Sequence, residues 1–337
     1  MASTADIRER LRAFVRVRTG DPGAEVGDLT SLPGHAGQSY GFVLEHQSGG
    51  QRISDRLVLR IAPEGVRIAG TADVVRQARI MVSLADTAVP VPPIKWFGDE
   101  PEWFGRPYFV AAFIHGNKLA LGDHEFDALE QRRLAKLTIR TMAALHAVPW
   151  EPRRAVWGEP LSLADEMARL DTLLERPTLE PAMVGRAPEL RARLRASLPP
   201  APRLGCVHGD LNWTNCLYES GALRAVIDWE LAQIGAVLLD LGWICLFSDR
   251  LTWVKQDLIP RFGATPDELV AIYREHITAR VSDREVGWFR GFACYRFGVI
   301  TAFNVMLHRR GKRHDPMWED IALTGPRFFE RGLELLG

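Results

Sequence analysis

The sequence predicts an α+β protein in which strands are concentrated in the first third of the chain and helices make up most of the rest. Apolar segments of strand length occur at residues 57–61 and 106–115, and Gly116 follows the second. From residue 127 onward, apolar residues instead recur at helical spacing. A chain of 337 residues with 47% hydrophobic content can bury a sizeable core, and its length favours two lobes over one compact unit.

The N-terminus begins with an amphipathic pattern. Ile7, Leu11, Phe14 and Val15 fall on one face of a helix over residues 5–18, which predicts a helix that packs on a larger body. The same periodicity predicts further helices over residues 71–84, 127–148, 161–174, 188–198, 238–249, 265–281, 284–308 and 315–335.

Composition argues against several classes of protein. Lys and Arg number 42, as do Asp and Glu, so no global basic field indicates nucleic acid as a partner. The four cysteines contain no C-x-x-C pair and are expected to be small buried residues, which fits a reducing, cytoplasmic location. The chain has no segment of signal-peptide type and no run of ~18 apolar residues, so we expect no membrane partner. No pattern specifies an oligomeric state.

Carboxylates and an amide follow short apolar strands within residues 204–228. His208, Asp210 and Asn215 come after the first strand, and Asp228 ends a later one. Phosphoryl transfer requires one carboxylate that orients and deprotonates the hydroxyl, together with oxygen ligands for a Mg²⁺ that neutralises the moving charge. Asp210, Asn215 and Asp228 supply that set.

The spacing of these residues is also characteristic. His-Gly-Asp-x-x-x-x-Asn at residues 208–215, Ile-Asp-Trp-Glu at 227–230 and Asp-Leu-Gly-Trp at 240–243 together resemble the aminoglycoside phosphotransferase family. Members of this family are small-molecule kinases with a bilobal protein-kinase-like fold. The resemblance therefore implies a small β-rich N-lobe and a larger, mostly helical C-lobe.

The resemblance also implies roles for individual residues. It makes Asp210 the catalytic base and makes Asn215 and Asp228 the ligands of Mg²⁺. It further implies that His208 braces the loop from below and that Asp240 accepts hydrogen bonds from the backbone amides of the loop.

Two other functions remain open at this point. One is a nucleotide-binding protein that lacks transferase activity. The other is a metal-dependent hydrolase with His208, Asp210 and Asp228 as ligands. A hydrolase would want a second nearby histidine, and His208 is the only one between Val207 and Gly242.

A glycine-punctuated turn precedes the strand of residues 57–61. Its glycines would let the backbone close over nucleotide phosphates, and Ser39 would add a hydroxyl. Kinase-like folds carry a phosphate-binding lysine on the later strand, where this chain has Arg60, so Arg60 is the expected phosphate anchor. The glycines are Gly34, Gly37 and Gly41.

The helix over residues 71–84 is expected to supply the partner of Arg60. Family members often read Arg-Glu-x-x-x-Leu here, but this chain has Gln77 in place of the glutamate. We expect either Gln77, as a neutral partner, or Asp73, one turn earlier on the same face, to pair with Arg60.

Residues 106–115 correspond, by the resemblance, to the hinge whose backbone groups bind the edge of adenine. Val110 and Ala112 are the expected base-binding positions, because small side chains there leave room for a base. The expected domains are accordingly a nucleotide-binding N-lobe at residues 1–114 and a helical C-lobe, with the catalytic loop and the substrate pocket, at residues 115–337.

The phosphate acceptor is expected to be a small molecule. Protein kinases carry an arginine before the catalytic aspartate, where this chain has Gly209. About a dozen residues separate Asp228 from Asp240, which is too few for a regulated activation loop. The expected activity is ATP- or GTP-dependent transfer of the γ-phosphate to a hydroxyl, with Mg²⁺ as cofactor.

Charge predicts the type of acceptor. Residues 240–337 contain 14 Lys and Arg against 13 Asp and Glu, and Ala236 stands where relatives often carry an acid. A polycationic aminoglycoside would require an acidic excess at its site. We therefore expect a neutral or anionic hydroxyl compound with an apolar part. The side chains available to hold an anion are Arg290, Arg296, His308, Arg309 and Arg310.

Overall fold

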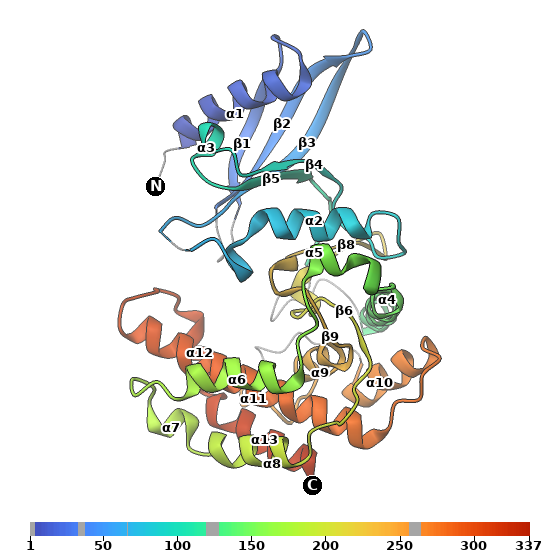
Figure 1. Ribbon diagram of the computed structural model, residues 1–337, viewed down its shortest axis with the longest axis vertical. Coiled ribbons are helices and arrows are strands. Elements are labelled where there is room, and N and C mark those ends of the chain that lie inside the picture. Colours follow the sequence, from blue (N-terminus) through green and yellow to red (C-terminus); the bar gives the residue numbers. More distant parts are fainter. Residues whose placement is uncertain (1–3, 33–37, 66, 119–127, 256–263) are drawn as a thin grey trace. The chain divides into compact units, whose positions relative to one another are not determined.

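The computed structural model describes residues 4–32, 38–65, 67–118, 128–255 and 264–337 (Figure 1). The chain forms two compact units. The first unit contains Met1–His115 together with Ala225–Ala232, which we term the return segment. The second unit contains Gly116–Arg224 and Gln233–Gly337. The sequence analysis assigned the return segment to the C-terminal region, whereas the structure packs it within the first unit.

A five-stranded antiparallel sheet forms the centre of the first unit. The strand order is β1-β2-β3-β5-β4, so β2, β3 and β5 each have a neighbour on both sides. The β2–β3 hairpin pairs without interruption along its length, whereas the β1–β2 register shifts once. The strands are β1 (Glu25–Leu32), β2 (Gln38–Ser48), β3 (Gln51–Ile61), β4 (Ile94–Gly98) and β5 (Tyr108–Ala112).

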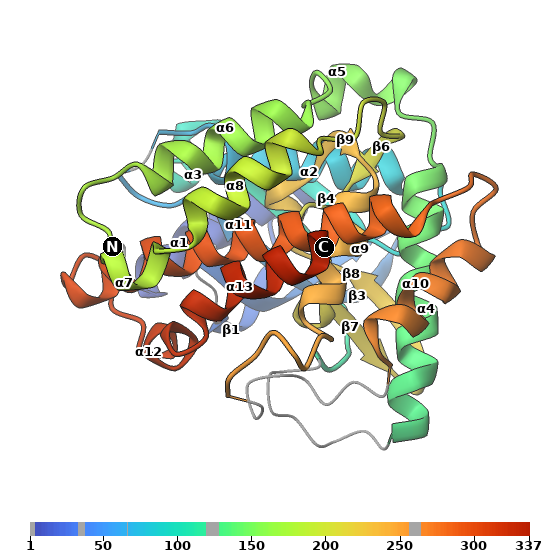
Figure 2. The ribbon, with the colours of Figure 1, turned by 90° about the horizontal axis from the view of Figure 1, so that it is seen from below.

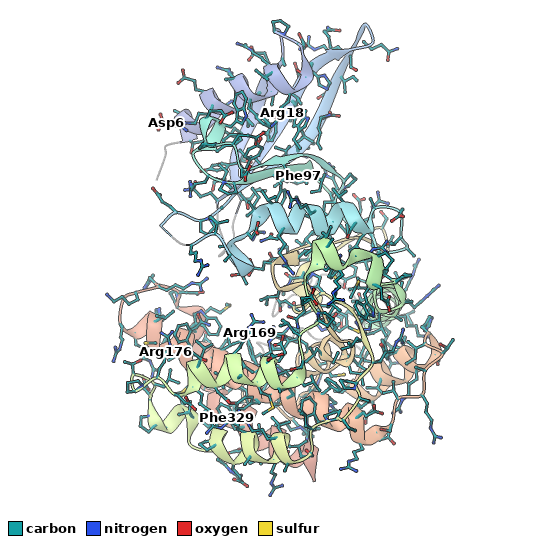
Figure 3. All side chains as sticks on the ribbon, in the orientation of Figure 1. Asp6, Arg18, Phe97, Arg169, Arg176 and Phe329 are labelled. Atoms are coloured by element: carbon teal, nitrogen blue, oxygen red, sulfur yellow. The ribbon has the colours of Figure 1, made fainter. Side chains whose placement is uncertain are left out.

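Helix α1 (Thr4–Thr19) packs its apolar face into the core of the first unit. Its buried residues are Ile7, Leu11, Phe14 and Val15, which confirms the predicted face. The Phe14 ring meets a group of aromatic rings at centroid distances of 5.2 to 5.6 Å: Trp96, Trp103, Phe104 and Tyr108. Arg18, labelled in Figure 3, donates hydrogen bonds to Glu100 and Tyr108 beside this group.

Short helices complete the first unit: η1 (Gly70–Ala72), α2 (Val74–Leu84), α3 (Pro101–Phe104) and η4 (Trp229–Leu231). Helix α2 contacts β4 and β5, and the η4 turn of the return segment contacts α2 and η1. The Val226 N–H donates to the Pro90 carbonyl at 2.8 Å. A backbone hydrogen bond therefore helps to hold the return segment in the first unit.

The second unit is mostly helical and is arranged around its longest helix, α11 (Asp283–Arg309), which contacts α6, α8, α9, α12 and α13. Figure 2 shows α8, α11 and α13 side by side. Gly242 allows α9 to approach α11 closely, because a Cβ there would lie 2.4 Å from the Phe289 carbonyl oxygen. The other helices are α4 (Ala128–Ala147), η2 (Glu151–Arg153), α5 (Arg154–Trp157), α6 (Leu163–Leu174), α7 (Pro181–Val184), α8 (Ala187–Ala196), η3 (Trp213–Asn215), α9 (Leu238–Leu246), α10 (Pro266–Glu275), α12 (Met317–Ala322) and α13 (Gly325–Leu336).

Two short strand pairs accompany these helices. β6 (Leu204–Val207) pairs antiparallel with β9 (Gln233–Ala236). β7 (Cys216–Glu219) pairs with β8 (Ala222–Val226), which runs into the return segment. Positive φ angles at Ser220 and Gly221 form the turn between β7 and β8.

The predicted and observed elements differ in two instructive places. The single helix expected over residues 315–335 is two helices, α12 and α13. Pro326 stands in the first turn of α13, where its missing N–H is tolerated but could not continue a helix. β9 was not predicted, because four residues with a central glycine carry too little strand signal.

All four cysteines are free and buried, as expected. Burial raises the pKa of the Cys206 thiol to about 11 and that of the Cys216, Cys245 and Cys294 thiols to about 12. Among the helices that the structure describes, none is long and apolar enough to cross a membrane.

Candidate active site

A polar loop, residues 208–215, begins at the end of β6. Pairing of Val207 with Gln233 fixes the strand from which the loop starts. Gly209 has φ +83°, in the left-handed region that favours glycine. The loop ends in the η3 turn, where Asn212 Oδ1 accepts a hydrogen bond of 2.8 Å from the Thr214 N–H.

Asp240, in the first turn of α9, binds the backbone of this loop. Its Oδ2 accepts from the His208 N–H and its Oδ1 from the Gly209 N–H, both at 2.8 Å. This confirms the prediction that Asp240 accepts hydrogen bonds from loop amides. Asp240 is only 1% exposed, and a buried carboxylate is tolerated only when its oxygens are bonded.

His146, near the end of α4, is the third partner of Asp240. Its Nε2 lies 3.2 Å from Asp240 Oδ2, and its Nδ1 lies 2.7 Å from the hydroxyl of Tyr273 on α10. His146 is 2% exposed, as expected for a structural histidine. Burial by itself raises the pKa of Asp240, but the hydrogen bond and charge of His146, with His208, outweigh it. The net pKa of Asp240 therefore lies below the ordinary value of 3.8.

Asp210 is held by side chains from the loop and from α9. Its Oδ1 accepts from Trp243 Nε1 at 2.8 Å and from Asn212 Nδ2 at 3.0 Å. Its Oδ2 accepts from Asn215 Nδ2 at 2.8 Å. Helix α9 thus fixes both the loop backbone, through Asp240, and the half-buried Asp210 carboxylate, through Trp243.

Asn215 faces Asp210 with the nitrogen of its amide. Nδ2 donates to both the carboxylate and the backbone carbonyl of Asp210, the latter at 2.9 Å. This orientation leaves Oδ1 as the atom that Asn215 can offer to a cation.

Asp228 belongs to the return segment of the first unit. Its backbone has φ +66° and ψ +56°, a left-handed conformation uncommon for residues other than glycine, although aspartate tolerates it better than most. Such conformations persist only where the surrounding structure holds them, and they cluster at functional sites.

Arg60, on β3, forms ion pairs with two carboxylates of the return segment. Nη1 lies 3.2 Å from Asp228 Oδ1, and Nη2 lies 3.2 Å from Glu230 Oε2. Ser39 is the cross-strand partner of Arg60 in the β2–β3 register. The two phosphate-binding candidates, Ser39 and Arg60, are therefore neighbours in the sheet. Gly37 and Gly34 lie outside the described residues, and Gly41 lies within β2.

Neither of the two α2 residues expected at Arg60, Gln77 or Asp73, pairs with it. Asp73 instead caps α2, accepting from the Arg76 N–H at 2.9 Å. Gln77 is 1% exposed and donates its amide to the Thr71 carbonyl at 3.0 Å. The correction has a simple electrostatic reason: two ionised acids of the return segment stabilise a guanidinium better than a neutral amide does.

The hinge candidates lie in the interior of the sheet. Val110 is fully buried and pairs with Leu59 on one side and Trp96 on the other. The Ala112 N–H donates to the Pro93 carbonyl at 2.8 Å. The Ala112 N–H therefore already has a partner within the first unit, and base binding at Val110 and Ala112 stays a prediction.

Three contributors to the site were not foreseen in their roles. Trp243 was recognised only as part of the Asp-Leu-Gly-Trp motif, Glu230 only as part of Ile-Asp-Trp-Glu, and Asn212 not at all. Each stands inside a motif or next to a motif residue, so the signal was present, but spacing alone does not show which donor meets which oxygen.

His208, a ligand of the alternative metal-dependent hydrolase, contacts the loop itself. Within the described residues, no group of three His, Cys, Asp or Glu side chains is arranged to hold a metal ion. His208 is fully buried, and its Nδ1 accepts the Asp210 N–H at 3.2 Å. A histidine engaged in this way serves the loop.

Comparison with known proteins gives the class of this chain. The model of the "Phosphotransferase enzyme family", abbreviated APH, matches residues 35–271. The chain therefore belongs to the APH phosphotransferase family, and its fold is the α+β, bilobal, protein-kinase-like fold of that family.

Two curated relatives of this chain are longer proteins. The chain is 28% identical over 202 residues to acyl-CoA dehydrogenase family member 10 of Mus musculus, covering 58% of this chain and 19% of the relative. It is 26% identical over 351 residues to acyl-CoA dehydrogenase family member 11 of Gallus gallus, covering 96% of this chain and 42% of the relative. The chain thus spans less than half the length of either relative.

Solved structures share the fold over nearly the whole chain. A putative aminoglycoside phosphotransferase from Ralstonia eutropha superposes with a TM-score of 0.74 at 19% identity, covering 97% of both chains. A thermostable mutant of APH(4)-Ia, in complex with ADP and hygromycin B, superposes with a TM-score of 0.65 at 16% identity. The match covers 97% of this chain and 99% of that one. The GDP and kanamycin complex of APH(2")-IIia also has a TM-score of 0.65 at 16% identity. That match covers 96% of this chain and 99% of the other.

Replacing Asp240 by asparagine should destabilise the protein in a pH-dependent way. Near neutral pH we expect Asp240→Asn to lower the free energy of unfolding by ~1–3 kcal/mol, because a charged acceptor of two buried amides is lost. The folded-state pKa lies below 3.8, so this stabilisation is present above 3.8 and is lost as the pH falls through the folded pKa. The gap between the wild type and the variant should therefore close in acid, as measured by urea unfolding at a series of pH values.

The matched control is Asp283→Asn, which alters a carboxylate with 94% of its side chain exposed. We expect that control to change stability by no more than about 0.5 kcal/mol. A gap for Asp240→Asn that stayed constant throughout the acid range would contradict the electrostatic account.

Proposed function

We propose that this protein transfers the γ-phosphate of ATP or GTP to a hydroxyl of a small molecule, with Mg²⁺ as cofactor and Asp210 as the catalytic base. The observation that carries the proposal is the Asp210 carboxylate, whose two oxygens are held by Trp243, Asn212 and Asn215 on a loop bound by Asp240. Phosphoryl transfer depends chiefly on positioning and electrostatic stabilisation, and this carboxylate is positioned from several directions.

The role of Asp210 is to accept the proton of the acceptor hydroxyl. Three donors hold its oxygens, so the carboxylate does not rotate away from an incoming hydroxyl. A hydroxyl aligned by a fixed base attacks the γ-phosphorus, the bond from the γ-phosphorus to the bridging oxygen breaks to release ADP or GDP, and the hydroxyl proton passes to the carboxylate. A general base placed in this way contributes roughly 10²–10⁴-fold to the rate.

Asn215 and Asp228 are the proposed ligands of Mg²⁺. Asn215 offers Oδ1, because its nitrogen is turned to Asp210, and Asp228 offers a carboxylate. Such hard oxygen donors suit Mg²⁺, which commonly takes one or two protein ligands and completes its shell with phosphate oxygens and water. Bound there, the ion would neutralise charge on the β- and γ-phosphates.

Arg60 is the proposed phosphate anchor, with Ser39 beside it. Its planar guanidinium can bind two phosphate oxygens at once, as it pairs with the two carboxylates of the return segment. Nucleotide phosphates would compete with Asp228 and Glu230 for this guanidinium. Release of Asp228 from Arg60 would free its carboxylate for the metal, so phosphate and metal binding should reinforce each other.

The proposed phosphate donor carries either adenine or guanine as its purine. The neighbours of known structure include one bound to ADP and one bound to GDP. We place base recognition at the backbone that follows the sheet, from the Ala112 carbonyl onward, since the Ala112 N–H is bonded to Pro93.

The proposed acceptor is a neutral or anionic hydroxyl compound with an apolar part. Two of the named neighbours are complexes with hygromycin B or kanamycin, but residues 240–337 of this chain lack an acidic excess. The curated relatives are named for acyl-CoA dehydrogenation. A hydroxylated acyl compound, free or as its CoA thioester, fits both the charge balance and those relatives.

Asp210→Asn should reduce turnover by roughly 10²–10⁴-fold while leaving nucleotide affinity near that of the wild type, because asparagine keeps the shape of the residue but cannot accept the proton. Turnover is measured by a coupled phosphotransfer assay and affinity by calorimetry, with Asp283→Asn as the surface control. Retention of more than about a third of the activity would remove Asp210 from the base role.

Asp228→Asn should abolish the Mg²⁺-dependent tightening of nucleotide binding. Asparagine tolerates the left-handed backbone of residue 228, so the variant tests charge and not backbone strain. Glu230→Gln is the matched control, because it removes the other carboxylate at Arg60 and should leave the Mg²⁺ dependence intact. Calorimetric titration of ADP with and without Mg²⁺ decides the matter. Equal Mg²⁺ dependence in Asp228→Asn and the wild type would refute the metal assignment.

Hydroxy acids, hydroxyacyl-CoA thioesters and macrolides should be better acceptors than aminoglycosides. Several ammonium groups placed at a site without matching acids would lose their hydration without gaining ion pairs, which weakens binding. The measurement is steady-state kcat/KM over a panel that includes kanamycin and hygromycin B. A value above about 10⁴ M⁻¹s⁻¹ for any aminoglycoside would overturn the proposed acceptor class.

A further inference from the structure

We infer that Arg296 binds an anionic group of the phosphate acceptor, a carboxylate or a phosphate, and so makes the second unit selective for anionic hydroxyl compounds. The inference rests on the proposed function, because it takes Asp210 to mark where the acceptor hydroxyl lies. It names a specificity-determining residue and narrows the acceptor from neutral or anionic to anionic.

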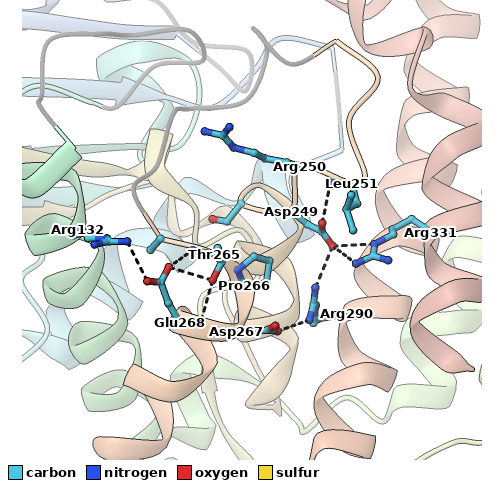
Figure 4. Close-up of a pocket in the computed structure, with 12 residues that line it drawn as sticks. Arg132, Asp249, Arg250, Leu251, Thr265, Pro266, Asp267, Glu268, Arg290 and Arg331 are labelled. Atoms are coloured by element: carbon cyan, nitrogen blue, oxygen red, sulfur yellow. Dashed lines mark hydrogen bonds and ion pairs between the residues drawn. The ribbon is translucent and has the colours of Figure 1, made fainter.

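Five side chains were expected to be available to hold an anion, and they differ in the partners that the structure gives them. They are Arg290, Arg296, His308, Arg309 and Arg310. Arg290 is held by Asp249 and Asp267, and Asp249 also binds Arg331, as Figure 4 shows. These ion pairs line a cavity of about 430 Å³ and already neutralise the Arg290 guanidinium.

The C-terminal end of α11 holds the other excluded candidates. Arg309 donates to Glu180 and Glu319, and His308 Nε2 lies 3.8 Å from Glu319. Arg310 is exposed at the C-cap of α11, fourteen positions beyond Arg296, or ~21 Å along the helix axis at 1.5 Å per residue. Arg296 is the candidate that remains.

A single side chain, that of Trp243, contacts both Arg296 and the Asp210 carboxylate. Its Cζ is 4.5 Å from the centroid of the Trp243 ring, and the Nε1 of the same indole donates to Asp210 Oδ1 at 2.8 Å. Trp243 therefore contacts the base with its N–H and the guanidinium with its ring face. A compound whose hydroxyl reaches Asp210 would have its next few atoms near Arg296.

Arg296 has no acidic partner of its own. Among the residues that the structure describes, no carboxylate lies within ion-pair distance of Arg296. Its guanidinium instead makes a cation–π contact with the Trp243 ring. The side chain is half-buried. A half-buried guanidinium without a counter-ion keeps all its N–H donors for an incoming anion, and its planar fork matches a carboxylate or a phosphate.

Apolar rings pack against the Trp243 indole that Arg296 contacts. The Trp243 ring packs edge-to-face against Phe247 at 5.4 Å and Phe297 at 5.5 Å. Phe247 and Ile300 are half-buried at the border of this cluster, and Ile300 follows Arg296 by one turn of α11. An anion paired here would be shielded from water on one side, which strengthens the ion pair. The same rings would contact an apolar part of the acceptor.

Arg176, after α6, provides a matched comparison (Figure 3). Its Cζ lies 4.9 Å from the Phe303 ring, so it has the same kind of cation–π contact. It differs from Arg296 in being exposed and in stacking on a ring that has no contact with Asp210 among the described residues. Any effect of losing an arginine from an aromatic ring alone should appear equally at both positions.

The test is a binding measurement that does not depend on phosphoryl transfer. Hexanoate, hexyl phosphate and methyl hexanoate are titrated by calorimetry into the full-length wild type, Arg296→Gln, Arg296→Lys and Arg176→Gln. We expect the wild type to bind one of the two anions at least ~10-fold tighter than the ester, the usual worth of a charge-assisted hydrogen bond. Whichever anion binds tighter identifies the source of the negative charge.

Arg296→Gln should reduce this preference to about one, Arg296→Lys should keep only part of it because the fork is lost, and Arg176→Gln should keep all of it. If Arg296→Gln fails to fold, the Lys variant decides the question, and an undiminished preference there would overturn the inference. A wild type without preference, or equal losses in the Arg176 and Arg296 variants, would overturn it as well.

Kinetics then separates this inference from the proposed function. With an anionic acceptor, Arg296→Gln should raise KM by ~10-fold or more with a smaller change in kcat, since the lost contact is made equally in the ground state and the transition state. Anion preference without any phosphoryl transfer would contradict the proposed function alone. Transfer without anion preference would contradict this inference alone.

Discussion

The buried carboxylate of Asp240 is the interaction on which the second unit depends most. It is 1% exposed, it binds the amides of His208 and Gly209, and it lies against His146, which in turn meets Tyr273. One side chain thereby joins α4, α9, α10 and the loop. Removing such a group leaves buried donors unsatisfied, which costs more than the hydrogen bonds themselves contribute.

Helix α9 extends this constraint to the side chain of Asp210. Asp240 and Trp243 lie one turn apart on it, and between them they fix the loop backbone and one oxygen of Asp210. Gly242, next to Trp243, allows α9 to lie against α11. The motif Asp-Leu-Gly-Trp is thus a structural device in which each polar or small residue has its own contact.

Sequence patterns anticipated the parts of this protein that follow from periodicity and motif spacing. The buried face of α1, the strand at β6 and the contact of Asp240 with loop amides were all foreseen, since each depends on residues close in sequence or on a specific motif. The partners of Arg60 were not. They come from Asp228 and Glu230, about 170 positions away, and periodicity contains no information about such contacts. The strand at β5 was foreseen, whereas its pairing with the short strand β4 was not, because β4 follows a proline-rich segment that reads as an extended connection.

The return segment also has a consequence for dividing the chain. Covalent connections pass between the two units after His115, after Arg224 and after Ala232. A fragment that ended at His115 would contain the sheet and Arg60 but neither Asp228 nor Glu230, so its central guanidinium would lose both carboxylates. Reconstitution from two pieces would therefore require the larger fragment to deliver eight of its residues into the smaller one, Ala225 to Ala232. Fragment complementation in this protein is best viewed as the insertion of a peptide into a preformed sheet domain.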